Sequence, residues 1–168
     1  SLLYLTLKPT WADVAAKSAA PTAAALSFIC LITGALWGRP TWGTYWVWDA
    51  RLTSMLFQLF LILGYMALRS AFQREQDAAR AGAILCLVGA VNLPIIKFSV
   101  DWWNTLHQPA GFITMSGSSL AGEFFWPLLY NLFAVMFVFG ALLMAAMRAD
   151  IQDRQYEAKL ARLNRSGS

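Results

Sequence analysis

Four long apolar runs, separated by short stretches that carry most of the charges, constrain this chain more than any other feature of its sequence. The runs cover positions 19–37, 52–68, 81–96 and 124–147. A helix rises about 1.5 Å per residue, so about 20 residues cross a hydrocarbon core of about 30 Å. Because lipid offers no partner to a backbone amide, each run is predicted to be a transmembrane helix. The third run is short, and we expect it to extend outward through Phe98 and Val100.

The scarcity of charge excludes an ordinary soluble domain. Charged residues make up 13% of the chain and hydrophobic residues 58%, against about 25% charged residues in a soluble domain. The formal net charge is +4, but the basic residues stand at the ends of apolar runs, which argues against a nucleic-acid partner. Cys30 and Cys86 lie inside apolar runs without a CxxC neighbour, so neither a disulfide framework nor a structural zinc site is predicted. The predicted fold class is an all-α, polytopic transmembrane helix bundle in contact with membrane lipid.

The distribution of lysine and arginine predicts how the bundle is oriented. If the four runs alternate in direction, most basic residues fall on one side, which the positive-inside rule assigns to the cytoplasm. These residues are Lys8, Lys17, Arg69, Arg74, Arg80, Arg148, Arg154, Lys159, Arg162 and Arg165. The opposite side holds only Arg39, Arg51 and Lys97 near helix ends. The connections 38–51 and 97–123 are therefore predicted to lie outside.

We predict one membrane-embedded domain over residues 1–165. The apolar residues 1–7 are too few to cross a membrane, and they are interpreted as the end of a longer helix in a chain truncated at its N-terminus. The tail 148–165 is rich in helix formers and is predicted to be cytoplasmic. It either extends the last span as a solvated helix or offers a face to a cytoplasmic partner. Residues 166–168 resemble a linker scar.

An aromatic segment over residues 37–51 is the most informative stretch of the chain. It contains four of the eight tryptophans, which are Trp37, Trp42, Trp46 and Trp48, together with Tyr45. Gly38, Pro40 and Gly43 are interspersed, so the stretch is predicted to be a loop or a short interfacial element. An interfacial aromatic belt accounts for one or two of these tryptophans. The alternative is a platform on which a large planar ligand stacks.

Asp49 and Arg51 close this segment at the start of the second run. Asp49 is a candidate cap for the helix N-terminus, and Arg51 can reach the lipid headgroups. Alternatively, Arg51 binds a carboxylate of the ligand, such as a heme propionate. The chemistry of the two residues leaves both readings open.

The stretch 42–51 resembles the tryptophan-rich WWD signature, WGxxWxWD, of the cytochrome c assembly family. Trp42, Gly43, Trp46, Trp48 and Asp49 occupy all its fixed positions. Within that family, stretches 49–54, 92–96 and 99–108 are similar to the system I heme-handling branch, CcmC or heme exporter protein C. The resemblance is close from about 33 to 108 and covers the last helix in layout only.

His107 is the only histidine, and it follows Trp102 and Trp103 in the second outer connection. A single histidine cannot form a structural zinc site, which takes about four protein ligands. Iron in heme already has four porphyrin nitrogens, so one imidazole is a meaningful axial ligand. The resemblance implies that His107 is such a ligand and that a second histidine lies in a loop before Ser1. Met115 is a weaker candidate for that second position.

The resemblance implies that the protein is not an enzyme and that it binds heme b on the periplasmic side of the bacterial inner membrane. It implies transfer of that heme to the chaperone CcmE, and assembly with CcmA, CcmB and CcmD into an ABC-type complex. The implied cofactor-binding residues are His107, Trp42, Trp46, Trp48, Asp49, Arg51, Trp102 and Trp103, with His107 as the metal ligand. Two alternatives stay open: a cytochrome c heme lyase of the same superfamily, although lyases are much longer, and a permease subunit that binds no heme.

Overall fold

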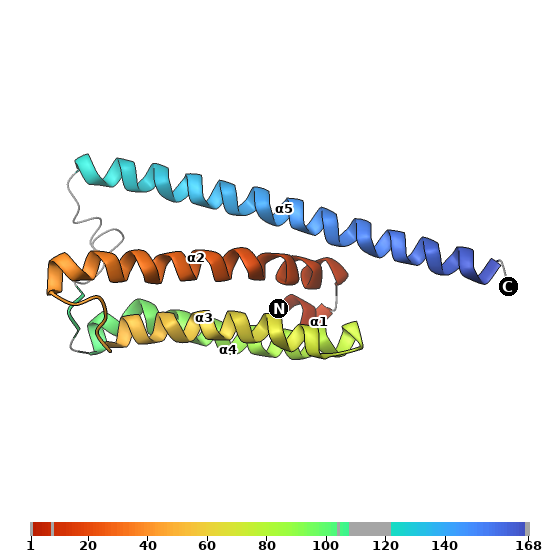
Figure 1. Ribbon diagram of the computed structural model, residues 1–168, viewed down its shortest axis with the longest axis horizontal. Helices are drawn as coiled ribbons and strands as arrows, with labels where there is room; N and C mark the ends of the chain where they lie inside the picture. Colours follow the sequence, from red (N-terminus) through yellow and green to blue (C-terminus); the bar gives the residue numbers. More distant parts are fainter. Residues whose placement is uncertain (1, 8, 104, 108–121, 167–168) are drawn as a thin grey trace.

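The computed structural model describes residues 2–7, 9–103, 105–107 and 122–166, and every regular element within these ranges is a helix (Figure 1). The helices are α1 (Leu2–Leu7), α2 (Thr10–Trp42), α3 (Ala50–Ala71), α4 (Glu75–Trp102) and α5 (Gly122–Ser166). Of these, α2, α3, α4 and α5 are long and apolar enough to cross a membrane. The predicted all-α bundle with four spans is therefore confirmed.

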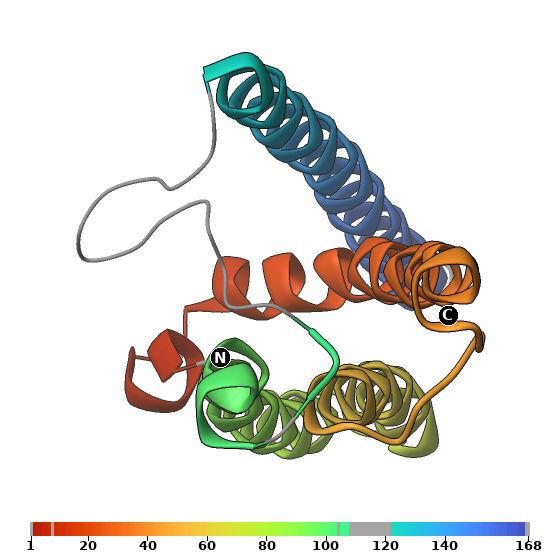
Figure 2. The same ribbon diagram turned by 90° about the vertical axis from the view of Figure 1, so that its left-hand side faces the viewer.

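The helices pack side by side with their axes roughly along one direction. The α3 and α4 helices form the most extensive pair, α2 packs on α3, and α5 packs on α2. Two ends result (Figure 1). The aromatic end holds the α2–α3 connection and the C-terminus of α4, and the charged end holds the α3–α4 connection. Figure 2, which looks onto the aromatic end, shows that α5 starts apart from α2 and approaches it farther along.

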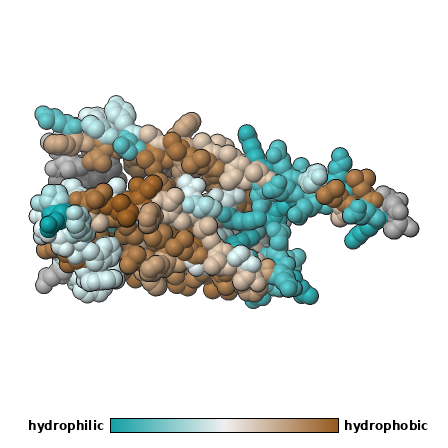
Figure 3. All heavy atoms as spheres, in the orientation of Figure 1, coloured by the Kyte–Doolittle hydropathy of each residue, from teal (hydrophilic) through white to brown (hydrophobic). Residues whose placement is uncertain are grey.

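The surface of the bundle is apolar over the stretch between these two ends. Large apolar side chains are exposed on each long helix, and the most apolar 18-residue stretch of α5 has none of its residues buried. Figure 3 shows hydrophobic residues over the middle of the bundle and hydrophilic residues gathered at the charged end and along the last part of α5. An apolar surface of this kind is stable only in lipid, so the chain is a multi-pass membrane protein.

Small and polar residues bring α3 and α4 into close contact. A Cβ atom on Gly82 would lie 2.8 Å from the ring of Tyr65, so only glycine fits at this position. Deeper along the pair, the buried Asn92 amide donates to the Ser54 carbonyl over 2.9 Å and to Gln58 Oε1 over 3.0 Å. These bonds satisfy polar groups that would be costly to bury unpaired. The result is a rigid pair of helices whose ends carry most of the residues discussed below.

The helix α2 is longer than the sequence predicts. The prediction that Gly38 and Pro40 begin a loop is wrong, because the helix continues to Trp42. Proline at this position removes one backbone donor near the helix end, and the neighbouring amides continue the helix. Thr41 Oγ1 also donates to the Trp37 carbonyl over 2.9 Å. Gly43, the third residue predicted to break helical structure, does so: it takes the left-handed conformation with φ 81° and ends the helix.

Other boundaries follow the predictions more closely. Helix α4 extends past Val100 to Trp102, as expected from its short apolar core. Residues 2–7 are helical, and α5 continues without a break from the apolar run into the tail, which is therefore a helical extension of the last span. Lys8, Met115 and most of the second outer connection lie outside the described residues, as do residues 167–168 of the predicted linker scar.

Candidate functional site

The α2–α3 connection folds back over the end of α2. A Cβ atom on Gly38 would lie 3.2 Å from the Thr44 carbonyl oxygen and 3.3 Å from the Trp42 ring, so glycine allows this close approach. The Arg39 guanidinium donates to the Gly43 carbonyl and lies over the Tyr45 ring, 5.5 Å from its centroid. These contacts fix the connection so that the following residues reach the start of α3.

Asp49 begins α3 as its N-cap. Its backbone is extended, and Oδ1 accepts a hydrogen bond from the Leu52 amide over 2.8 Å. This geometry confirms the capping role predicted from the sequence, in which a side-chain oxygen satisfies an amide of the first helical turn. The Asp49 side chain is only 4% exposed. Its second oxygen, Oδ2, points toward residues that follow α4.

Asp49 Oδ2 binds both Thr105 and His107. Thr105 Oγ1 donates to Oδ2 over 2.8 Å, and His107 Nδ1 lies 2.7 Å from the same oxygen. The His107 amide in turn donates to Thr105 Oγ1 over 2.9 Å. The hydroxyl thus donates to the carboxylate and accepts from the backbone, so it ties the carboxylate and the histidine backbone together.

The protonation of this cluster follows from its hydrogen bonds. Burial of the Asp49 carboxyl opposes ionisation, but the hydrogen bonds from Leu52, Thr105 and His107 outweigh that cost and lower its pKa below the usual value. An ionised carboxylate can only accept, so His107 Nδ1 carries the proton. In neutral imidazole the other nitrogen, Nε2, then has the free lone pair. Within the described part of the chain, Nε2 has no hydrogen-bond partner.

The predicted tryptophans fall into three groups at the aromatic end. The ring of Trp42 meets the His107 imidazole edge-on, with 4.6 Å between the centroids. The other ring pairs in these groups are Trp37–Trp42, Trp46–Trp48, Phe98–Trp102 and Trp102–Trp103, at centroid distances of 5.3, 5.4, 5.6 and 6.2 Å respectively. Four of these tryptophans are strongly exposed, namely Trp37, Trp48, Trp102 and Trp103, at 58%, 74%, 60% and 55%. The sequence predicts one platform; in the structure the tryptophans form three groups, and the ring of Trp42 is the one shown in contact with His107.

Two further predicted residues occupy different settings. Arg51 is half-buried in the first turn of α3 and forms no ion pair with any described residue. Trp46 packs against the core of the bundle, and its indole N–H is buried without a partner among the described residues. Leaving such a donor unpaired costs about 1–3 kcal/mol, so Trp46 would gain from an added acceptor.

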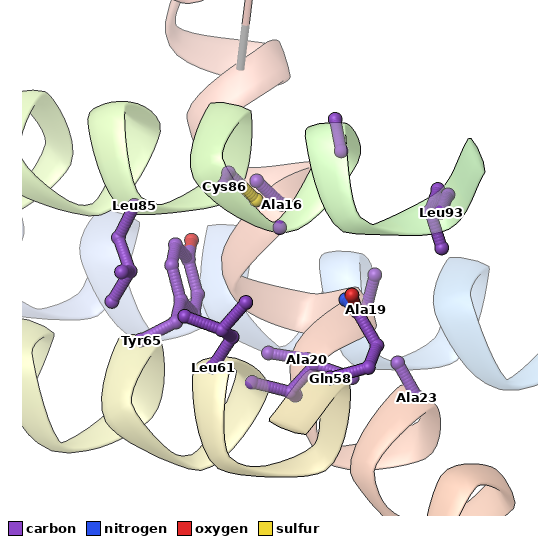
Figure 4. Close-up of a pocket in the computed structure, with 13 residues that line it drawn as sticks. Ala16, Ala19, Ala20, Ala23, Gln58, Leu61, Tyr65, Leu85, Cys86 and Leu93 are labelled. Carbon is purple, nitrogen blue, oxygen red and sulfur yellow. The ribbon is translucent and has the colours of Figure 1, made fainter. Parts of the chain in front are cut away.

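The structure also has a half-open pocket of about 370 Å³ between α2, α3 and α4. Figure 4 shows that Ala16, Ala19 and Ala20 leave this space open, and that Gln58 and Cys86 also border it. His107 and the tryptophans do not line the pocket, so it is separate from the cluster at the aromatic end.

A bare metal ion does not suit the aromatic end. Among residues 2–7, 9–103, 105–107 and 122–166, no group of three or more His, Cys, Asp or Glu side chains could hold a metal ion. A single imidazole in contact with an indole ring fits a metal that brings its own equatorial ligands. Heme meets this requirement, and its flat apolar surface matches the rings.

Thr105 was missed from the sequence. The hydroxyl of a threonine often binds the amide two residues later, so the spacing Thr105 to His107 carried a local signal. The contact between Asp49 and His107 joins positions 58 residues apart, and no local pattern indicates it.

Comparison with known proteins identifies the family. The chain matches the family model for CcmC, heme exporter protein C, over residues 1–162. It is similar to proteins of that name from three bacteria. The Bradyrhizobium diazoefficiens protein is 57% identical over 155 residues, covering 92% of this chain and 59% of the relative. The Paracoccus denitrificans protein is 41% identical over 167 residues, covering 99% and 69%.

The third relative, from Escherichia coli K12, is 47% identical over 137 residues, covering 82% of this chain and 55% of the relative. The chain thus spans between 55% and 69% of the length of these three proteins. The family model covers nearly the whole chain, including the tryptophan segment and His107. The chain therefore belongs to the heme exporter protein C family.

Proposed function

We propose that this protein binds heme b at its aromatic end and presents it to the heme chaperone CcmE during cytochrome c maturation. One observation carries the proposal: the only imidazole of this sequence lies against Trp42, with Nδ1 held by Asp49 and with no partner for Nε2 among the described residues. That nitrogen is the one a heme iron would take. The name of the related proteins, heme exporter protein C, supports the same ligand.

Each residue of the site has a role in this proposal. His107 Nε2 supplies an axial bond to the iron, and the exposed rings of Trp48, Trp102 and Trp103 supply apolar surface for the porphyrin. Arg51 would bind a propionate through its guanidinium, and the Trp46 indole N–H would gain an acceptor from the same kind of group. The heme itself contributes an iron whose equatorial positions are already filled by porphyrin nitrogens.

The surroundings of the site suit transfer better than storage. Rings with more than half of their surface exposed hold a flat ligand weakly and leave its edge accessible to another protein. We propose that this accessible edge is presented to CcmE, and that the protein works with CcmA, CcmB and CcmD in an ABC-type complex of the bacterial inner membrane. The aromatic end would then face the periplasm, in agreement with the distribution of lysine and arginine.

A direct test removes the imidazole. In purified protein loaded with heme, His107→Ala should lose most of the heme absorbance, because residues 1–168 contain no other histidine to replace this axial bond. The matched control is Leu106→Ala, which shortens an exposed neighbouring side chain and should leave the spectrum intact. Heme absorbance that is equal in His107→Ala and the control would refute the assignment of His107 as the iron ligand.

A further inference from the structure

We infer that Asp49 and Thr105 are positioning residues, which act together to fix the His107 imidazole in the one tautomer and orientation that presents Nε2 to iron. This inference rests on the proposed function and distinguishes the residues that would contact heme from those that position the histidine. The resemblance of the tryptophan segment assigned Asp49 to the heme pocket as a binding residue. The geometry instead separates residues that would touch heme from residues that control the ligand.

Asp49 cannot itself contact heme while its present hydrogen bonds persist. Oδ1 is occupied by the Leu52 amide, and Oδ2 receives both Thr105 Oγ1 and His107 Nδ1. The side chain is 4% exposed, whereas the His107 side chain is 18% exposed. The carboxylate therefore reaches a ligand only through the imidazole. Carboxylates that bind the second nitrogen of a metal-bound histidine fix its tautomer and raise its basicity.

Thr105 also helps to position the imidazole, through a hydrogen bond to the backbone of His107. Its hydroxyl accepts from the His107 amide over 2.9 Å and donates to Asp49 Oδ2 over 2.8 Å. The imidazole is thus connected to the carboxylate twice, directly through Nδ1 and indirectly through its own backbone. Because Asp49 also caps α3, the position of the imidazole is fixed relative to the start of a transmembrane helix. A ligand on a connecting segment thereby gains the rigidity of a helix terminus.

The first test reads the tautomer without heme. His107 is the only histidine, so protein labelled with ¹⁵N-histidine gives one pair of ring-nitrogen signals in an NMR spectrum. At neutral pH the parent protein should show the proton on Nδ1. Asp49→Asn keeps a capping oxygen for Leu52 but directs an amide donor at the imidazole, and so should move the proton to Nε2. A parent protein with its proton on Nε2 would overturn the inference.

The second test measures heme affinity and reduction potential in the loaded protein. Loss of a residue that supports a metal ligand typically costs about 10- to 100-fold in affinity, and we expect a loss in this range for Asp49→Asn. The potential should rise, because the imidazole loses the carboxylate that makes it a stronger donor to iron. Thr105→Val should show a smaller loss of affinity, and Thr105→Ser, which keeps the hydroxyl, should restore the parent values.

Asp49→Ser separates positioning from capping. Serine is also a good N-cap, so this variant should keep the thermal stability of α3 while its short side chain releases the imidazole. Asp49→Ser with parent affinity and potential would show that Asp49 serves only the helix. If heme stays bound in His107→Ala, the proposed function is wrong at its ligand. If His107→Ala loses heme while the Asp49 and Thr105 variants match the parent, only the positioning inference fails.

Discussion

The two ends of the bundle use polar side chains in opposite ways. At the aromatic end, the buried Asp49 binds the half-buried Thr105 and His107, and no described residue binds Nε2 of the imidazole. At the charged end, acidic and basic side chains from four helices neutralise one another. These side chains are Asp13, Lys17, Arg69, Glu75, Asp150 and Arg154. At the aromatic end, one imidazole nitrogen has no partner among the described residues. At the charged end, the acidic and basic side chains pair with one another and join the helices.

The ion pairs at the charged end join α2 to α3 and join α5 to both α2 and α4. Arg69 of α3 binds Asp13 of α2 through both guanidinium nitrogens, and both side chains are about one-tenth exposed. Arg154 of α5 binds Glu75 of α4 over 2.8 Å and Asp150 of its own helix over 2.7 Å. Helix α5 departs from the bundle toward the aromatic end (Figure 2), and at the charged end its residues Asp150 and Arg154 pair with Lys17 and Glu75. The comparison predicts that damage at the charged end reduces stability and spares the aromatic end.

The largest effect is expected at the Asp13–Arg69 pair. Arg69→Ala removes both hydrogen bonds to the buried Asp13 carboxylate and leaves only Arg154 Nη2 at 4.0 Å, and breaking a buried pair in this way costs about 3–5 kcal/mol. The free energy of unfolding in detergent should therefore fall by that amount, measured by denaturant titration. The control Arg74→Ala removes an exposed arginine at the start of α4 and should have little effect.

The same variant also tests the separation between the two ends. Folded Arg69→Ala protein should bind heme with the parent absorbance spectrum, because the imidazole and its carboxylate are held at the opposite end of the bundle. A spectrum that changes along with stability would mean that the two ends are coupled through α3.

A smaller loss is expected where α3 and α4 make their closest approach. Gly82→Ala would place a methyl group 2.8 Å from the ring of Tyr65, which is buried and cannot move freely. Overpacking of this kind costs about 1–3 kcal/mol, and thermal unfolding in detergent can measure it. Gly64→Ala is the matched control, since its new methyl group meets only Leu85 at 3.8 Å. Equal melting temperatures for the two variants would contradict the close contact.

Much of the fold could be predicted because lipid leaves an apolar run few alternatives to a helix. The bounds were harder, since α2 begins at Thr10, before the predicted start at 19. Lys17 precedes the first predicted run, whereas in the structure Asp13 and Lys17 both lie within α2 and are neutralised by Arg69 and Asp150. Those partners come from other helices, so a local pattern of charge could not reveal them.

In the candidate site too, the local contacts could be predicted from the sequence and the contacts between distant residues could not. The cap formed by Asp49 is a local interaction, and its position before an apolar run was enough to predict it. Asp49 and His107 can pair because α3 begins and α4 ends at the same end of the bundle. The tryptophan signature includes Asp49, and the wider family resemblance selected His107, but neither indicated that the two residues touch. Thr105 lay outside the signature, and only the geometry assigns it a role.

Acid should loosen the charged end through Asp150, which lies beyond the apolar run of α5. Burial raises the pKa of its carboxyl, but hydrogen bonds from Lys17 and Arg154 and their charges outweigh burial and lower it below the usual value. A lowered pKa in the folded state means that the ionised form stabilises the fold. This contribution is complete above the ordinary aspartate range and disappears as the pH falls through the lowered value.

Asp150→Asn should remove that part of the pH dependence. At neutral pH the variant should lose up to about 1 kcal/mol of stability, the upper value for an exposed ion pair, because Lys17 is 46% exposed. At a pH below the lowered pKa, parent and variant should unfold at nearly the same temperature, since the parent carboxyl is then also uncharged. High salt should shrink the difference at neutral pH, because Lys17 and Arg154 are open to screening. A difference that persists in acid would mean that Asp150 stabilises α5 by packing rather than by charge.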